Sequence, residues 1–185
     1  MTILFLSDIH GIKKNLPIVK KKIEEYKCDK IVVLGDLYYI GPRNKMEEEY
    51  DIEFVKDFLE SYKDRLICIR GNCDSEVDKE YSPFPIVDNL GLIEDNGLEI
   101  YLTHGHIYNE TNWNKANSIL VFGHYHTPFI LEQENNLFIN PGSISLPKDN
   151  HYPSYLLYQD GHFEIRDIED NIIDEKDVKI QVITS

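Results

Sequence analysis

The sequence predicts an α/β protein in which two mixed sheets are stacked on each other with helices on the outside. Short apolar runs alternate with helical patterns over residues 3–69, which is the order of parallel β-α-β units. From Pro83 onward, short strand-like runs follow one another closely with turn residues between them, as in hairpins. Several apolar runs also end in polar side chains of the kinds that bind metal ions.

The first part of the chain contains three predicted strands and two predicted helices. The strands are the apolar runs at residues 3–6, 31–34 and 66–69, and each ends at a polar or glycine-containing corner. Apolar side chains recur at helical spacing in two segments: Leu16, Val19, Ile23 and Tyr26, and then Ile52, Val55, Leu59 and Tyr62. Asn15 is a candidate N-cap of the first helix, and Pro17 suits its first turn.

The second part is predicted to consist mostly of strands. Asp95-Asn96-Gly97 is a hairpin signal that precedes a strand at residues 98–102. Residues 112–117 are expected to form a short helix or an irregular segment. Further strands are predicted at residues 119–122, 129–131, 137–139, 155–158 and 163–165, and a last half-exposed strand at residues 178–183.

Composition limits the class of protein. We expect a single domain over residues 1–185, because this length suits one hydrophobic core. The formal net charge of −14 disfavours binding to long nucleic acid, although a small anion could bind beside cations. Three irregularly spaced cysteines predict a reducing cytoplasm. We find neither a signal peptide nor a run of membrane-spanning length, so no membrane partner is expected.

The polar residues at the strand ends form a candidate metal site. In α/β sheets, ligand sites gather at the carboxyl ends of the strands. The full pattern is Asp8-x-His10, Gly35-Asp36, Gly71-Asn72, His104 and Gly123-His124-x-His126. Seven oxygen and nitrogen ligands without a thiolate suit Mn, Fe, Co, Ni or Zn better than a dedicated Mg or Ca site. Asp36 is interpreted as the carboxylate shared between two ions.

These motifs, in this order, resemble the calcineurin-like metallophosphoesterase superfamily over residues 8–126. Segments 41–44, 70–78, 103–106 and 140–143 resemble, within it, the small bacterial YfcE phosphodiesterases. The resemblance implies a four-layer α/β/β/α sandwich, the metallo-dependent phosphatase fold, with a dinuclear metal centre. It also implies a division of the ligands: Asp8, His10 and His126 for one ion, Asn72, His104 and His124 for the other, and Asp36 between them.

The implied activity is hydrolysis of small phosphodiesters. Two divalent ions, with Mn expected first, would lower the pKa of a bound water, and the resulting hydroxide would attack phosphorus. The expected catalytic residues are Asp36, Asn72, Cys73 and His104. Asn72 and Arg43 are expected to bind substrate, because a guanidinium suits bidentate contact with phosphate.

Five positions near the motifs carry narrower expectations. In much of the superfamily, a histidine that protonates the leaving group stands where this chain has Cys73. A thiol with a pKa of about 8.5 is a poorer proton donor, so diesters with activated leaving groups should be favoured, unless Cys73 is only a packing residue. Asp74 is expected to orient a ligand or to cap a turn. Tyr38 and Tyr39 follow Asp36 closely enough to line the cleft. Tyr125 stands where the family more often has Thr or Ser, which affects the expected shape of the pocket.

Two classes of alternative remain open on the sequence. Within enzymes, the same site could serve a phosphomonoesterase or a cyclic-nucleotide phosphodiesterase. In another class, the retromer subunit with this fold is a protein-binding scaffold, but it lacks part of the metal set, whereas this chain has all seven ligand positions. The tyrosines and the predicted last strand would permit self-association without specifying it.

Overall fold

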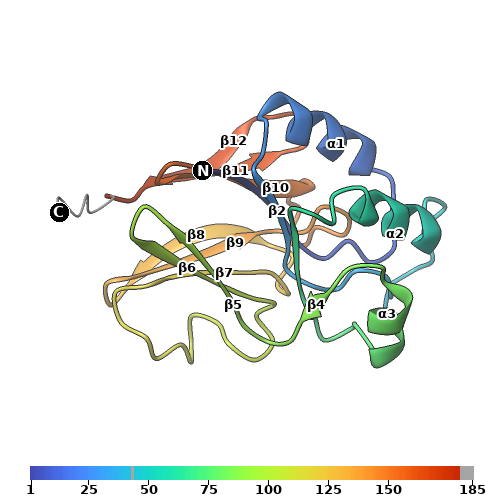
Figure 1. Cartoon of the computed structure of the whole chain (residues 1–185), viewed down its shortest axis with the longest axis horizontal. Helices are drawn as coiled ribbons and strands as arrows, with labels where there is room; N and C mark the ends of the chain where they lie inside the picture. Colours follow the sequence, from blue (N-terminus) through green and yellow to red (C-terminus); the bar gives the residue numbers. More distant parts are fainter. Residues whose placement is uncertain (43, 180–185) are drawn as a thin grey trace.

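The computed structural model describes residues 1–42 and 44–179, and in them two β-sheets pack face to face (Figure 1). The seven-stranded sheet has the order β12-β11-β10-β1-β2-β3-β4, and the five-stranded sheet has the order β5-β6-β7-β9-β8. The strands are β1 (Thr2–Leu6), β2 (Lys30–Val33), β3 (Leu66–Ile69), β4 (Ile86–Val87), β5 (Gly91–Asp95), β6 (Leu98–Thr103), β7 (Ile119–Phe122), β8 (Pro128–Gln133), β9 (Asn136–Pro141), β10 (Ser154–Gln159), β11 (His162–Asp167) and β12 (Ile172–Asp177).

Strand β1 lies in the middle of the larger sheet, and its two faces contribute to two different hydrophobic cores. It pairs in parallel with β2 and antiparallel with β10. Successive side chains on a strand point to opposite faces. Accordingly, Ile3 and Phe5 enter the core between the two sheets, whereas Leu4 and Leu6 enter the core under the helices. A strand that is apolar on both faces is therefore buried on both sides.

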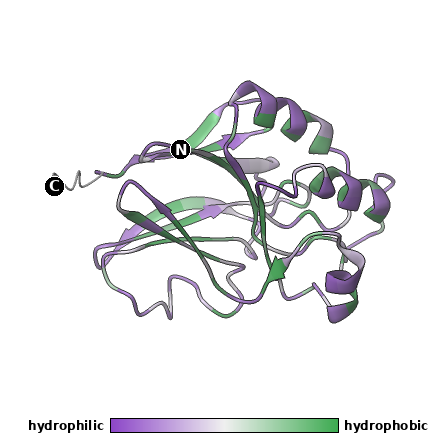
Figure 2. Cartoon of the chain, viewed as in Figure 1, coloured by the Kyte–Doolittle hydropathy of each residue, from purple (hydrophilic) through white to green (hydrophobic). Residues whose placement is uncertain are grey.

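The helices cover the larger sheet. Helices α1 (Leu16–Glu25) and α2 (Ile52–Glu60) lie on the same side of this sheet (Figure 1), and their apolar side chains belong to one core. Helix α3 (Glu76–Tyr81) buries none of its residues and is mostly hydrophilic in Figure 2. It is held by a capping box, in which the Ser75 side chain and the Asp78 side chain each bond the other residue's backbone N–H.

The outer face of the smaller sheet is covered differently. Residues 105–118 form turns and bends here, so this fourth layer is an irregular segment and not a helix. Trp113 packs with Tyr101, Tyr125 and Phe129 on a small core of Leu120, Phe122 and Phe138. Residues 112–117 were expected to form a short helix or an irregular segment, and they form an irregular segment.

The predicted fold class is confirmed, with local corrections. The strands at residues 66–69 and 119–122 have the predicted bounds. The last described strand is β12, at Ile172–Asp177, whereas the prediction placed it at residues 178–183, of which 180–183 lie outside the described residues. Helix α3 was not predicted, because its sequence has no apolar periodicity. None of the helices in the described part of the chain is long and apolar enough to cross a membrane.

Candidate metal centre

The loops that follow five parallel strands meet at one edge of the two sheets. Asp8 and His10 follow β1, Asp36 follows β2, and the remaining predicted ligands follow β3, β6 and β7. Backbone hydrogen bonds join these loops, such as His10 N–H to Asp36 O at 2.9 Å and Gly123 N–H to His104 O at 2.9 Å. The His124 N–H donates to Asp8 Oδ2 at 3.1 Å and so links one sheet to the other.

The backbone at this edge is unusual. Five of the seven predicted ligands adopt positive φ angles, namely Asp8 (56°), His10 (51°), Asp36 (56°), His124 (67°) and His126 (63°). Residues with a Cβ rarely adopt this region, and those that do cluster at functional sites, where the surroundings hold them in place. The chain therefore turns sharply after β1, β2 and β7, where these polar side chains lie.

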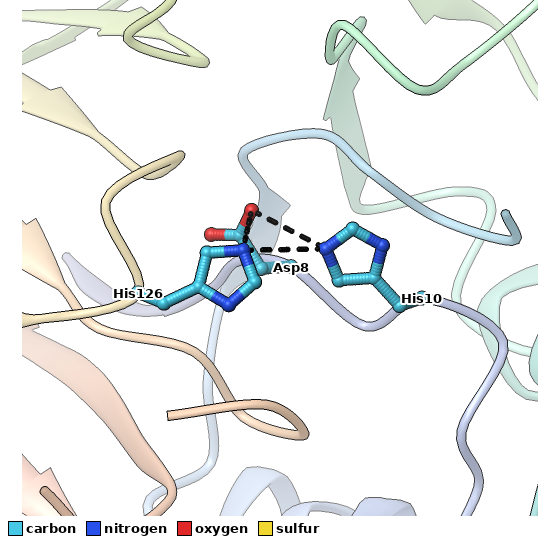
Figure 3. Close-up of side chains that lie close together, drawn as sticks. All are labelled: Asp8, His10 and His126. Carbon is cyan, nitrogen blue, oxygen red and sulfur yellow. Dashed lines mark hydrogen bonds and ion pairs between the residues drawn. The ribbon is translucent and has the colours of Figure 1, made fainter. Parts of the chain in front are cut away.

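One compact group consists of Asp8, His10 and His126, whose side chains point toward one another in Figure 3. Asp8 Oδ1 lies 3.3 Å from His126 Nε2 and 3.9 Å from His10 Nε2. The two Nε2 atoms are 3.3 Å apart. All three residues are buried, and within the described chain Asp8 Oδ1 has no hydrogen-bond partner.

The outer nitrogens of the histidines explain this geometry. Nδ1 of His10, His104 and His126 lies 2.6 Å from the backbone carbonyl of Tyr39, Leu34 and Leu146, respectively. A carbonyl only accepts, so each Nδ1 must carry a proton, and in the neutral form of each ring the lone pair is on Nε2. Metal-binding histidines are oriented in this way. Because the Nε2 lone pairs of His10 and His126 face each other, a shared cation between them fits the donor set.

Asp36 lies between the two halves of the site. Its Oδ1 accepts a hydrogen bond from the Cys73 N–H at 2.8 Å. Its Oδ2 lies 3.7 Å from His10 Nε2 and 3.4 Å from His104 Nε2. Burial acts to raise the pKa of Asp36, but the hydrogen bond and charge of His104 outweigh burial, so this pKa lies below its usual range. One oxygen is thus fixed by the backbone and the other is available to both halves.

The second half consists of His104, Asn72 and His124. His104 Nε2 lies 3.0 Å from Asn72 Oδ1, and its ring centroid is 5.1 Å from that of His124. Burial lowers the pKa of His104, but Asp36 and Asp8 outweigh it and raise this pKa to about 9. Positive charge at Nε2, from a proton or a metal ion, is therefore favoured. The compact groups among the described residues include His104 but not the His124 ring.

Asp74 holds the loop that carries Asp36. Its carboxylate accepts hydrogen bonds from the backbone N–H groups of Asp36 (2.8 Å), Leu37 (2.8 Å) and Gly71 (2.7 Å). Gly71 packs so closely that a Cβ there would overlap the Asp36 side chain. Asp74 thus joins the loops after β2 and β3 and sets the position of Asp36, which agrees with the expected orienting role and shows no turn capping.

The other residues predicted near the site are not all found there. Cys73 is at the site, within 4.8 Å of ligand atoms of His10 and Asp36. Tyr38 does not line the cleft, because it is buried in the core under the helices and its hydroxyl pairs with Ser82. Tyr125 packs edge-on against Phe122, on the outer face of the smaller sheet. Arg43 lies outside the described residues, so its predicted contact with substrate stays a prediction.

Sequence reasoning missed the groups that support the ligands. Ser143 Oγ donates to Asp8 O at 2.8 Å, and Asn140 Nδ2 donates to Gly123 O at 2.7 Å. The corner at residues 140–143 was a visible turn signal in the sequence, but its contacts across the fold were not. The three carbonyls that orient the histidines have no sequence signal, because every residue has a carbonyl.

Proteins similar in sequence to this chain include a phosphodiesterase and a probable metallophosphoesterase. The chain is 37% identical over 161 residues to Phosphodiesterase YfcE of Escherichia coli (strain K12), covering 84% of this chain and 85% of that protein. It is 28% identical to the Probable metallophosphoesterase YsnB of Bacillus subtilis (strain 168), covering 85% of this chain and 83% of that protein.

Solved structures share the fold. The structure of YfcE, a phosphoesterase from E. coli, superposes with a TM-score of 0.92 at 31% identity and covers 97% of this chain and 100% of that one. Vacuolar Protein Sorting 29 from Cryptosporidium parvum shares the fold, with a TM-score of 0.61 at 19% identity over 96% of this chain and 98% of that one. The model of the calcineurin-like phosphoesterase superfamily domain matches residues 1–160, and the chain therefore belongs to this superfamily and is homologous to the phosphodiesterase YfcE.

Proposed function

We propose that this protein is a metal-dependent phosphodiesterase that hydrolyses small phosphodiesters. The observation that carries the proposal is the convergence of unshared lone pairs, from Asp8 Oδ1 and from Nε2 of His10 and His126, in a buried space beside Asp36. Buried groups of this kind are unfavourable unless a cation meets them. Homology to the phosphodiesterase YfcE favours the diester as the substrate class.

The residues would divide between two divalent ions. Asp8, His10 and His126 would hold one ion, Asn72, His104 and His124 would hold the other, and Asp36 Oδ2 would be shared. When bound, such ions neutralise phosphate oxygens and lower the pKa of a water molecule to about 7, which supplies the attacking oxygen. Manganese is the ion we expect first, because carboxylate, amide and imidazole ligands without a thiolate suit it.

The chain's own residues restrict the leaving group. Burial and the neighbouring Asp36 raise the pKa of the Cys73 thiol to about 12, so the thiol is protonated at neutral pH. A group with so high a pKa gives up its proton poorly in a transition state. Aryl diesters release a phenolate, which can leave without protonation, whereas alkyl esters release an alkoxide, which needs a proton, so aryl diesters should react faster.

Size and charge restrict the substrate further. The formal net charge of −14 repels a long polyanion, so a small diester is favoured over long nucleic acid. The cysteines Cys28, Cys68 and Cys73 are free thiols, and a reducing cytoplasm is the compartment that we propose.

A substrate panel tests the proposal. The purified protein, loaded with Mn, would be assayed on an aryl phosphodiester, an aryl phosphomonoester and 3′,5′-cyclic nucleotides. We expect the highest kcat/KM on the aryl diester. A preference for the monoester or for cyclic nucleotides would show that the proposed substrate class is wrong. If none of these compounds is hydrolysed in a metal-dependent way, the enzyme assignment fails in favour of a binding scaffold.

A further inference from the structure

His106 lies at the edge of the metal centre but has no role in the ligand set. It follows His104 by two residues and is exposed, whereas His104 is fully buried. The His106 ring centroid lies 5.3 Å from that of His104 and 6.2 Å from that of His124. The solvent-exposed ring therefore sits beside the two histidines predicted for the second ion.

The backbone fixes this position. Gly105 has a φ of 109°, and a Cβ there would press on the Phe122 ring, Gly123 O and His124 Cβ. Only a glycine therefore lets the segment that carries His106 approach the loop after β7 so closely. The Gly105 carbonyl in turn accepts a hydrogen bond from Asn109 Nδ2 at 3.0 Å.

The rest of the segment is also tied down. The Trp113 N–H donates to Asn109 O at 3.0 Å, and Asn112 Nδ2 donates to Ile107 O at 2.6 Å. The Trp113 indole N–H donates to Ser118 Oγ at 2.8 Å. These internal hydrogen bonds hold the backbone of the exposed segment, and with it the position of His106 in the chain, in place before any ligand binds.

The ring of His106 itself is unused. Neither ring nitrogen makes a hydrogen bond within the described residues, in contrast to His10, His104 and His126, whose Nδ1 atoms all meet carbonyls. A histidine that is neither a ligand nor a packed core residue, yet is held beside two predicted ligands, has a free donor for a molecule from solvent.

We propose that His106 is a substrate-contacting residue that donates a hydrogen bond to a phosphoryl oxygen of the bound ester, beside the second ion. This inference rests on the proposed function, because that function identifies the bound anion as a phosphate ester. The position of the His106 ring comes from the structure alone. A neutral or a charged imidazole has an N–H donor, so the contact does not depend on the protonation state. Because the contact is made to the phosphoryl group, product-like anions should share it.

Two substitutions and a control test this contact. His106→Ala removes the donor, His106→Gln keeps an N–H donor on a side chain of similar length, and His162→Ala removes a histidine at the opposite end of the larger sheet. Each Mn-loaded protein would be assayed for KM and kcat on an aryl diester. The inhibition constant of inorganic phosphate and the bound metal would be measured in parallel.

A hydrogen bond to a charged group predicts that His106→Ala raises both KM and the phosphate inhibition constant about tenfold, with the metal content unchanged. His106→Gln should recover most of this loss, and His162→Ala should match the wild type. Values for His106→Ala within about twofold of wild type, or a loss of bound metal, would overturn the proposal.

The result is separable from the proposed function. If the Mn-loaded wild type hydrolyses no diester, the enzyme assignment fails, but calorimetric titration with inorganic phosphate still compares the wild type with His106→Ala. Weaker phosphate binding by His106→Ala alone would then support the contact, and equal binding, or no binding by either protein, would overturn it.

Discussion

Two groups of histidine and carboxylate side chains lie in the described part of this molecule, and they differ in what surrounds the histidine. The metal centre groups Asp8 with His10 and His126 in buried space. The second group, which we name the surface cluster, consists of His162, Glu164, Glu175 and Asp177 on β11 and β12. Both have ligand atoms close enough to hold an ion.

The two groups differ in what the ring nitrogens of their histidines contact. In the metal centre, each Nδ1 bonds a carbonyl and Nε2 is left free. In the surface cluster, His162 Nδ1 lies 2.7 Å from Asp177 Oδ1 and Nε2 lies 3.0 Å from Glu164 Oε1. Both nitrogens then donate, as in an imidazolium, and Glu164 is also paired with Arg166 at 2.8 Å. Proximity of ligand types is therefore not enough, because the outer partner of the histidine decides what it can bind.

The backbone separates them as well. The predicted ligands Asp8, His10 and His126 are in left-handed corners, whereas His162 and Glu164 lie in a strand. Strained corners persist only where the surrounding structure holds them. Four predictions test whether the metal centre serves metal binding and catalysis while the surface cluster contributes only to stability. They are given from the largest expected effect to the smallest.

The largest effect is expected from Asp36→Asn. An amide cannot supply the negative charge that allows two divalent ions to lie close together, so bound metal and diesterase activity should fall together, the activity by about a thousandfold. Metal analysis and steady-state assays measure both. Glu164→Gln in the surface cluster is the control and should change neither. Retention of both ions with near-normal turnover in Asp36→Asn would contradict the shared role of this carboxylate.

A second effect is expected from Asp74→Asn, which places an N–H against one of the three backbone N–H groups that Asp74 binds. Displacement of Asp36 should weaken Mn binding about 10- to 100-fold, measured by calorimetry. Asp167→Asn is matched, because Asp167 also accepts backbone N–H groups, from Glu169 and Asn171 at 2.9 Å. Equal Mn affinities for these two variants would show that Asp74 only stabilises the fold.

A third, smaller effect concerns the leaving group. Cys73→His introduces an imidazole that donates a proton more readily than the thiol, so hydrolysis of alkyl phosphate esters should rise relative to aryl esters by about tenfold. The ratio of kcat/KM for matched alkyl and aryl diesters measures this change. An unchanged ratio would mean that Cys73 only packs beside the site.

The smallest effect is expected from the surface cluster. Burial lowers the pKa of His162, but Asp177 and Glu164 outweigh it, so this pKa is raised. The stabilising contribution should thus be complete below the unfolded value of about 6.5 and lost as pH rises through the folded pKa. His162→Gln should lower Tm at pH 5.5 by no more than about 3 °C, and less at pH 9. A larger Tm difference between the wild type and His162→Gln at pH 9 than at pH 5.5 would contradict the predicted pH dependence.

Much of this molecule could be predicted from periodicity. Apolar runs that end in polar corners, such as Ile31–Asp36, indicated both the parallel strands and the edge at which the ligands meet. Ser75-x-x-Asp78 is a capping-box pattern, but α3 was missed because no apolar periodicity follows it. The place of β12 was missed because its sequence lacks the apolar run of a buried strand and its position depends on pairing with β11. Asp74 illustrates the same limit, since its partners at residues 36 and 37 are close only after folding.

The central claim is that residues from both sheets form a cage for a pair of divalent ions that the reaction requires. Metal analysis of the purified wild type, with diesterase assays before chelation, after chelation and after return of Mn, tests it most directly. We predict about two ions per chain, loss of activity on chelation and recovery with Mn. Full activity in protein freed of metal would contradict the claim.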